Sequence, residues 1–123
     1  MNSDFYNKVF TENEKKLINS SNLSDVGITD NVFLLSNEEA EKYFANDDVR
    51  RCKATEYAVK NGAYVTKNGA YVTDNGYCNW WLRSPYPNYS FYVCSVGRDD
   101  GVIRYNSFLN DEIAVRPALW INL

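Results

Sequence analysis

The sequence predicts an α+β fold, with helices in the N-terminal half and short antiparallel strands in the C-terminal half. Residues 11–14 (TENE) and 36–39 (SNEE) are capping boxes, in which a hydroxyl and a carboxylate satisfy the first backbone groups of a helix. After residue 79, short runs of aromatic and β-branched residues alternate with polar turns, a pattern typical of strands. Helices followed by strands favour α+β over a repeated βαβ arrangement.

The N-terminal half is interpreted from its capping boxes and apolar spacing. Leu17 and Ile18 supply a short apolar face to the first helix, and Asn61-Gly62 is a stop signal for the last one. The expected elements are a helix from 12 to about 19–21, a loop at 20–31, a buried strand at 32–35, a helix from 37 to about 46–47, and a helix at about 53–60.

The C-terminal half begins with a repeat. NGAYVTK at 61–67 recurs as NGAYVTD at 68–74, and Asn-Gly pairs favour tight turns, so we expect a lengthened loop or a small hairpin. A neutral duplication without a role is the alternative. The expected strands cover residues 80–83, 91–96, 102–105 and 113–123, with a turn at 97–101 joining the middle pair.

Length and composition limit the classes of function. A chain of 123 residues predicts a single domain, and 15% aromatic residues favour a recognition surface. The chain has no His, which excludes a Ser-His-Asp triad and every His-ligated metal site. A net charge of −3 argues against nucleic acid as a partner, and no run approaches the ~20 apolar residues of a membrane span. We expect no cofactor and no metal.

Three cysteines, Cys52, Cys78 and Cys94, cannot all pair within one chain, and no CxxC motif occurs. Three reduced thiols in a reducing compartment, or one disulfide with one free thiol, both fit this count. The opening residues MNSDFYNKVF are not typical of a signal peptide. Reduced cysteines would indicate the cytoplasm, and the localisation otherwise stays open.

Two segments carry a resemblance to a known family. WWLRSP at 80–85 and AVRPALW at 114–120 resemble the two signatures of an uncharacterised domain family common in gut bacteria and their phages. FYNKVFTENEKKLI at 5–18, VFLLSNEEAEKYF at 32–44 and RCKATEYA at 51–58 extend the resemblance over nearly the whole chain. The resemblance implies a C-type-lectin-like fold, in the branch shared with formylglycine-generating enzymes, which carries ligand-binding loops.

The chain departs from that family in two places. Members usually begin with earlier strands, so the chain resembles a single domain over residues 1–123 that lacks the family's first strands. The terminal strands of C-type-lectin-like folds pair, so the closing strand at 115–123 is expected to lack its usual partner and to mediate a homodimer. In addition, Tyr86 stands where the family usually has Gly.

The segment between the signatures is the predicted binding surface for a protein or carbohydrate ligand. Of its 27 residues (86–112), 13 are Tyr, Asn, Ser or Asp, a mixture that resembles an antibody paratope. Codons for Tyr, Ser and Asp are reached from Asn codons by changing adenines alone, as diversity-generating retroelements do in targets that resemble C-type-lectin-like domains. An ordinary set of polar loops is the alternative. The candidate ligand-binding residues are Tyr86, Asn88, Tyr89, Tyr92, Arg98, Asp99, Tyr105, Asn106 and Asn110.

The signature residues have two interpretations each. The rings of Trp80, Trp81 and Trp120 are suited either to stack on sugars or to fill the core, and strand alternation puts Trp80 and Trp81 on opposite faces. Arg83 and Arg116 are suited either to bind carboxylates of a ligand or to hold the framework.

Enzymatic function finds less support in the sequence. Cys78 and Cys94 match no motif of formylglycine-generating chemistry, and the lectin calcium motifs are absent. The carboxylates Asp99, Asp100, Asp111 and Glu112 are typical of turns. We therefore predict a non-enzymatic binding domain. The alternatives are a structural module of a larger surface or phage protein and a formylglycine-generating-enzyme-like remnant.

Overall fold

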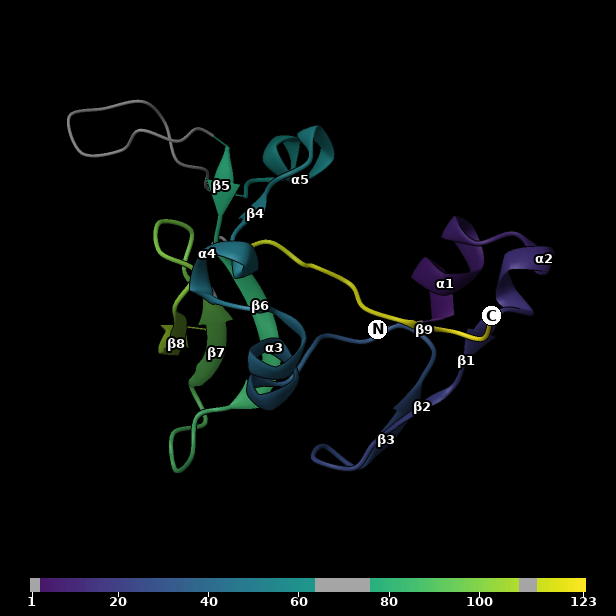
Figure 1. Cartoon of the computed structure of the whole chain (residues 1–123), viewed down its shortest axis with the longest axis horizontal. Coiled ribbons are helices and arrows are strands. Elements are labelled where there is room, and N and C mark those ends of the chain that lie inside the picture. Colours follow the sequence, from purple (N-terminus) through teal and green to yellow (C-terminus); the bar gives the residue numbers. More distant parts are fainter. Residues whose placement is uncertain (1–2, 64–75, 109–112) are drawn as a thin grey trace. The chain divides into compact units, whose positions relative to one another are not determined.

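The computed structural model describes residues 3–63, 76–108 and 113–123, and the chain divides into two compact units (Figure 1). Unit 1 combines Met1–Leu34 with Pro117–Leu123, and unit 2 spans Leu35–Arg116. Short helices and small antiparallel sheets confirm the α+β class. Among the described residues, no helix has the length and apolar character needed to cross a membrane. The single domain over 1–123 stays a prediction.

Unit 1 is built from short elements. They are α1 (Ser3–Val9), α2 (Glu12–Lys15), β1 (Ile18–Asn19), β2 (Ser21–Leu23), β3 (Ile28–Asp30) and β9 (Trp120–Ile121). The Thr11 capping box is confirmed, since the Thr11 hydroxyl accepts a hydrogen bond from the Glu14 backbone N–H at 3.3 Å. The helix expected to reach 19–21 ends at Lys15, because none of its four residues is buried and a helix without a packed face is marginal.

The prediction of a loop at 20–31 is wrong, because β2 and β3 form an antiparallel hairpin there. Leu23 lies opposite Ile28, and the Gly27 N–H donates to the Leu23 carbonyl at 2.9 Å. Leu23 is buried together with Val32 and Phe33, so this hairpin contributes to the core of unit 1. The strand expected at 32–35 is reduced to one bridge, in which Phe33 and Ala118 exchange backbone hydrogen bonds of 2.8 and 2.9 Å.

The closing segment has a partner within the chain. Strand β9 pairs with β1 in antiparallel register, with Ile18 opposite Ile121, and the Asn122 N–H donates to the Leu17 carbonyl at 2.8 Å. The expected lack of a strand partner is therefore wrong. The long strand expected at 113–123 is also broken up, because Pro117 has no N–H to donate to a ladder.

Unit 2 contains the signature WWLRSP and the predicted binding segment. Its elements are α3 (Asn37–Tyr43), α4 (Asp47–Arg50), β4 (Cys52–Lys53), α5 (Glu56–Lys60), β5 (Tyr77–Cys78), β6 (Trp80–Pro85), β7 (Tyr92–Val96) and β8 (Ile103–Phe108). The Ser36 capping box is confirmed. The helix expected at 53–60 starts later, at Glu56, because Cys52 and Lys53 pair with β5. Most of the NGAYVT repeat lies outside the described residues.

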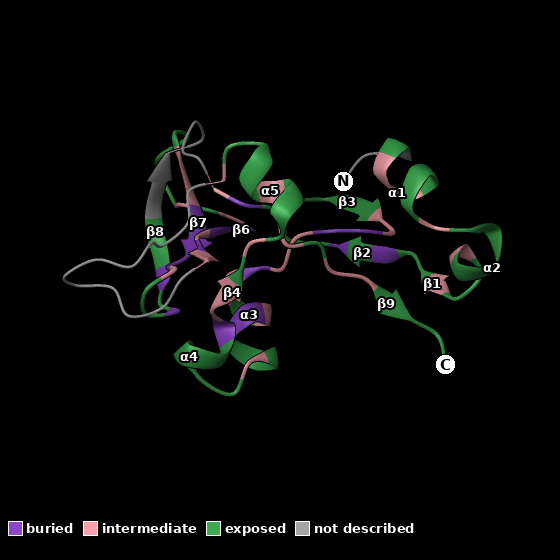
Figure 2. Ribbon diagram, turned by 90° about the horizontal axis from the view of Figure 1, so that it is seen from above, coloured by how far each residue is buried: buried purple, intermediate pink, exposed green. Residues whose placement is uncertain are grey.

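Strands β6, β7 and β8 form the antiparallel sheet of unit 2, in the order of the sequence. The strands expected at 80–83, 91–96 and 102–105 and the turn at 97–101 are confirmed, with strand bounds that differ by up to three residues. The core is the buried cluster on this sheet and on α3, coloured purple in Figure 2. Its members are Ala40, Trp80, Leu82, Cys94, Val96 and Ile103.

Gly101 ends the turn between β7 and β8 in a position that only glycine fits. Its φ is +71°, and a Cβ atom added there would lie 1.6 Å from the Asp47 carbonyl oxygen of α4. The Gly101 carbonyl in turn accepts a hydrogen bond of 3.2 Å from the Arg50 guanidinium. Helix α4 and the turn therefore approach each other backbone to backbone.

Substituting Gly101→Ala should destabilise the protein by more than about 3 kcal/mol, because backbone strain adds to a contact that forces α4 away from the turn. Gly62→Ala is the matched control: its φ is +96°, but a Cβ atom there meets nothing within 4 Å. We expect the control to lose only about 1–2 kcal/mol. Urea unfolding followed by circular dichroism measures both, and equal losses would contradict the close approach.

The homodimer predicted through the closing segment stays a prediction. About half of the side-chain surface of Ile121 is exposed, so Ile121→Lys should return a dimer to the monomer mass by placing a charge in an apolar contact. Val49→Lys, at an equally exposed position on α4, is the control and should leave the dimer intact. Light scattering at high concentration measures the mass. A monomeric wild-type protein would refute the prediction.

Candidate functional site

The ring of Trp80 organises the framework below the predicted binding segment. Only 1% of its surface is exposed, and its indole N–H donates to the Arg50 carbonyl at 3.1 Å. The Phe44 ring packs beside it with a centroid distance of 6.1 Å. The core interpretation of Trp80 is confirmed, and its buried ring does not serve as a sugar platform. Trp81 is half-buried and alternates with Trp80 as expected, while Trp120 is exposed in unit 1.

Arg116 has a framework role. Its guanidinium lies over two rings, 4.8 Å from the Phe44 centroid and 4.9 Å from the Trp80 centroid, and it donates to the Arg50 carbonyl at 3.2 Å. Ala114, from the same signature, pairs with Trp80 and accepts a hydrogen bond of 3.0 Å from the Trp81 N–H. The two signatures, far apart in the sequence, are thus joined through backbone and ring contacts.

Arg83 fastens the sheet to α3. Its guanidinium donates two hydrogen bonds to the Glu39 carboxylate in a bidentate ion pair, with N–O distances of 2.5 and 3.0 Å. The same carboxylate accepts a hydrogen bond of 2.9 Å from the Ser36 N–H, as part of the capping box. One carboxylate therefore caps the helix and anchors β6, which supports the framework interpretation of Arg83.

Three of the predicted binding tyrosines gather at one end of the sheet. Tyr86 and Tyr89 belong to the connection between β6 and β7, and Tyr92 is the first residue of β7; residues 86–92 are here called the tyrosine loop. Their ring centroids lie 5.4, 6.0 and 6.2 Å apart, within the range of favourable aromatic contacts. The Tyr86 N–H donates to the Tyr92 carbonyl at 3.2 Å, and Asn88 takes a φ of +68° at the bend. The loop is thus closed by its own contacts.

The tyrosine loop presents aromatic surface to solvent. Tyr89 is 55% exposed, while Tyr86 and Tyr92 are partly buried beside it. Phe91 is 73% exposed in the same loop and is not among the binding residues that the sequence predicts. The composition of polar, adaptable residues does not point to Phe91, whereas an apolar ring between Ser90 and Tyr92 is the sequence signal that does.

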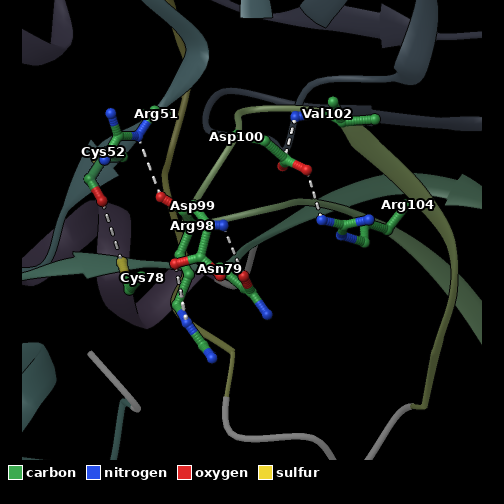
Figure 3. A network of polar contacts seen from close by, with 9 residues as sticks. All are labelled: Arg51, Cys52, Cys78, Asn79, Arg98, Asp99, Asp100, Val102 and Arg104. Carbon is green, nitrogen blue, oxygen red and sulfur yellow. Dashed lines mark hydrogen bonds and ion pairs between the residues drawn. The ribbon is translucent and has the colours of Figure 1, made fainter. Parts of the chain in front are cut away.

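Arg98 and Asp99 lie in the turn between β7 and β8, here called the arginine turn (residues 97–101), and their contacts are internal (Figure 3). The Arg98 N–H donates to the Asn79 side-chain oxygen at 2.8 Å, and the Arg98 carbonyl accepts from the Arg51 guanidinium at 3.1 Å. The Arg98 guanidinium lies 3.6 Å from the Asp99 carboxylate. The backbone of this turn is therefore held from both sides.

Asp100 also serves the arginine turn. Its carboxylate accepts hydrogen bonds from the Val102 N–H at 3.1 Å and from the Arg104 guanidinium at 2.7 Å (Figure 3). These contacts agree with the interpretation of Asp99 and Asp100 as turn residues. Asp111 and Glu112 lie outside the described residues.

The predicted binding residues therefore form more than one group. The tyrosine loop and the arginine turn lie at opposite ends of β7, because consecutive connections in an antiparallel sheet alternate between its two ends (Figure 1). Tyr105 is exposed within β8, apart from both connections. The side chain of Asn106 and the whole of Asn110 lie outside the described residues.

The cysteines are three free thiols of different accessibility. Cys78 and Cys94 are buried, and Cys52 is partly exposed. Burial raises the pKa of the Cys78 thiol to about 11, and burial also raises the pKa of Cys94, against a hydrogen bond of 3.2 Å from the Asn37 amide. Both buried thiols are protonated at neutral pH. Among the described residues, no group of three potential metal ligands comes together.

Unit 2 thus combines helices and an antiparallel sheet in a framework held by Trp80, Arg83 and Arg116, with the tyrosine loop and the arginine turn at opposite ends of β7. The chain belongs to the family described as a domain of unknown function, DUF6273, whose model matches residues 1–123. No curated protein and no solved structure gives a significant match.

The Arg83–Glu39 ion pair should contribute more to the free energy of unfolding than an exposed ion pair does. Its side chains are only 12% and 24% exposed, so Arg83→Met should cost about 1–3 kcal/mol by leaving a poorly hydrated carboxylate. Arg104→Met is the matched control, because the Arg104–Asp100 pair is 47% and 44% exposed and should contribute less than about 1 kcal/mol. Urea denaturation compares the two variants, and a larger loss for Arg104→Met would contradict the framework role of Arg83.

Proposed function

We propose that the chain is a non-enzymatic binding module that contacts its ligand through the tyrosine loop. The observation that carries this proposal is the cluster of Tyr86, Tyr89 and Tyr92 rings, in mutual contact and open to solvent at Tyr89. Exposed Phe91 extends the same surface. No enzymatic step is part of this proposal.

The tyrosine loop is preorganised for binding, because its own contacts hold it closed. Tyrosine offers a large contact area with few rotatable bonds, so little conformational entropy is lost when it binds. The rings of the tyrosine loop already restrain one another, and the backbone hydrogen bonds between Tyr86, Tyr89 and Tyr92 hold the loop closed. A surface that is ordered before binding avoids part of the entropic cost of association.

The proposal includes a C-type-lectin-like fold for the whole chain as a single domain. Two observations support it. The closing strand β9 pairs with β1, as terminal strands do in that fold, and the two family signatures meet at the Trp80–Ala114 bridge. A fold of this kind supplies a fixed framework from which loops of variable sequence extend.

The ligand is proposed to be a protein or a carbohydrate, and the segment 86–112 a surface diversified by a retroelement. The support is compositional, since 13 of its 27 residues are Tyr, Asn, Ser or Asp. Both ligand classes suit tyrosine, which combines an apolar ring face with a hydroxyl group. A net charge of −3 disfavours nucleic acid.

Tyr89→Ala should weaken binding at least about tenfold, because truncating a central interface tyrosine removes a large desolvated contact. The probes are a glycan array and a displayed peptide library, which separate the two ligand classes. The best binder from either probe is then titrated against the wild-type protein and the variant by calorimetry.

Tyr57→Ala is the matched control, since Tyr57 is 77% exposed on α5 and outside the tyrosine loop. We expect it to bind like the wild type. Circular dichroism checks that both variants stay folded. Equal affinity of Tyr89→Ala and the wild type, or an equal loss in Tyr57→Ala, would refute the tyrosine loop as the contact surface.

A further inference from the structure

Cys52 and Cys78 face each other across the short ladder of β4 and β5. The two residues are direct partners in the antiparallel register, and both are free thiols. The Cys78 sulfur lies 3.5 Å from the Cys52 carbonyl oxygen (Figure 3). They are 26 positions apart in the sequence, so the fold alone brings them together.

The register places this pair within reach of a disulfide bond. The Ala54 N–H donates to the Gly76 carbonyl at 2.8 Å, so residues 54 and 76 are a hydrogen-bonded pair. Such pairs alternate with non-hydrogen-bonded ones along a ladder, which makes Cys52 and Cys78 a hydrogen-bonded pair with a Cα separation of about 5.5 Å. Disulfides span Cα separations of roughly 4.4–6.8 Å but need Cβ separations of roughly 3.5–4.5 Å, whereas opposed Cβ atoms in a hydrogen-bonded pair lie near the upper end of about 4.5–5.5 Å. The two strands must therefore approach slightly for the bond to form, and the resulting strain makes the bond easier to reduce.

The two thiols differ in exposure, so that Cys52 reacts with an external reagent before Cys78 does. Cys52 packs against the core but stays partly exposed, whereas its partner Cys78 is buried. Cys94, the third cysteine, is fully buried in strand β7 within the core. An external reagent therefore meets Cys52 first, and Cys78 is its register partner in the sheet.

The cysteine pair is also adjacent to both contacts that hold the arginine turn. Arg51 precedes Cys52 and donates to the Arg98 carbonyl, while Asn79 follows Cys78 and accepts from the Arg98 N–H. Figure 3 shows these contacts as one network. The two residues that hydrogen-bond to the Arg98 backbone are thus the immediate chain neighbours of Cys52 and Cys78.

We propose that Cys52 and Cys78 form a reversible cross-strand disulfide that fixes the arginine turn. The oxidant is a low-molecular-weight disulfide of the glutathione type. The Cys52 thiolate attacks one of its sulfurs and expels one thiolate, giving a mixed disulfide. The Cys78 thiolate then attacks the Cys52 sulfur and expels the second, so the protein loses two protons and two electrons while the reagent gains them.

The two-residue ladder explains why the bond is suited to be reversible. β4 and β5 contain only two residues each, so little strand pairing opposes the small rotations that closing and reopening need. Burial raises the pKa of Cys78 to about 11, which leaves little thiolate at neutral pH and slows its attack on any disulfide. Its position opposite Cys52 in the ladder favours the mixed disulfide as its target over reagent in solution. This inference does not depend on the ligand of the tyrosine loop.

The test incubates the full chain with oxidised glutathione at about pH 8. We expect intact-mass spectrometry to show the loss of two hydrogen atoms and peptide mapping to join Cys52 to Cys78, with full reversal by reduced glutathione. Hydrogen exchange of the Arg98 amide should slow several-fold in the closed form, because its Asn79 acceptor is held more firmly.

The Cys94→Ala variant should still form the intramolecular disulfide, whereas the Cys52→Ser variant should not. Circular dichroism checks the fold of each variant. Three outcomes overturn the proposal. They are a stable glutathione adduct on Cys52 with Cys78 still free, a disulfide between two chains, or a Cys52–Cys78 disulfide form in which the Arg98 amide exchanges as fast as in the dithiol form.

Discussion

The carbonyl oxygen of Arg50 is the point on which unit 2 depends. The buried indole of Trp80 donates to it at 3.1 Å, and the Arg116 guanidinium donates to it at 3.2 Å while lying over the Trp80 ring. One backbone acceptor thus joins the end of α4, the start of β6 and the segment after Ala114. Because the acceptor is shared within a packed interior, displacing any of these segments leaves a buried donor unsatisfied, which is costly.

This arrangement separates side chains that hold the framework together from the side chains of the tyrosine loop. Trp80, Arg83 and Arg116 are engaged with the core, the α3 cap and the Arg50 carbonyl, so their signatures describe a framework. In the tyrosine loop, the rings of Tyr86, Tyr89 and Tyr92 contact one another. Changes at its exposed positions would leave the Arg50 contacts intact, which is the physical condition for a diversified binding surface.

In contrast to the tyrosine loop, the arginine turn is held by contacts with other parts of unit 2. Its backbone is held by Arg51 and Asn79, and Gly101 packs against the Asp47 carbonyl without room for a side chain. Composition alone predicts Arg98 and Asp99 as binding residues, whereas in the structure the backbone of Arg98 is hydrogen-bonded to Asn79 and Arg51. Composition does not distinguish a polar loop that faces solvent from one that is fastened to its own fold.

Features that depend on residues close together in the chain are predictable from the sequence. Both capping boxes, the alternation of Trp80 and Trp81, and the turn at 97–101 follow from contacts within a few residues, and each was predicted. Tertiary structure decided the rest: the β2–β3 hairpin, the pairing of β9 with β1, the bounds of α2 and α5, and the meeting of Cys52 with Cys78. These depend on which distant segment supplies a hydrogen-bonding partner or a buried face, and two-residue strands carry no pattern long enough to name that partner in advance.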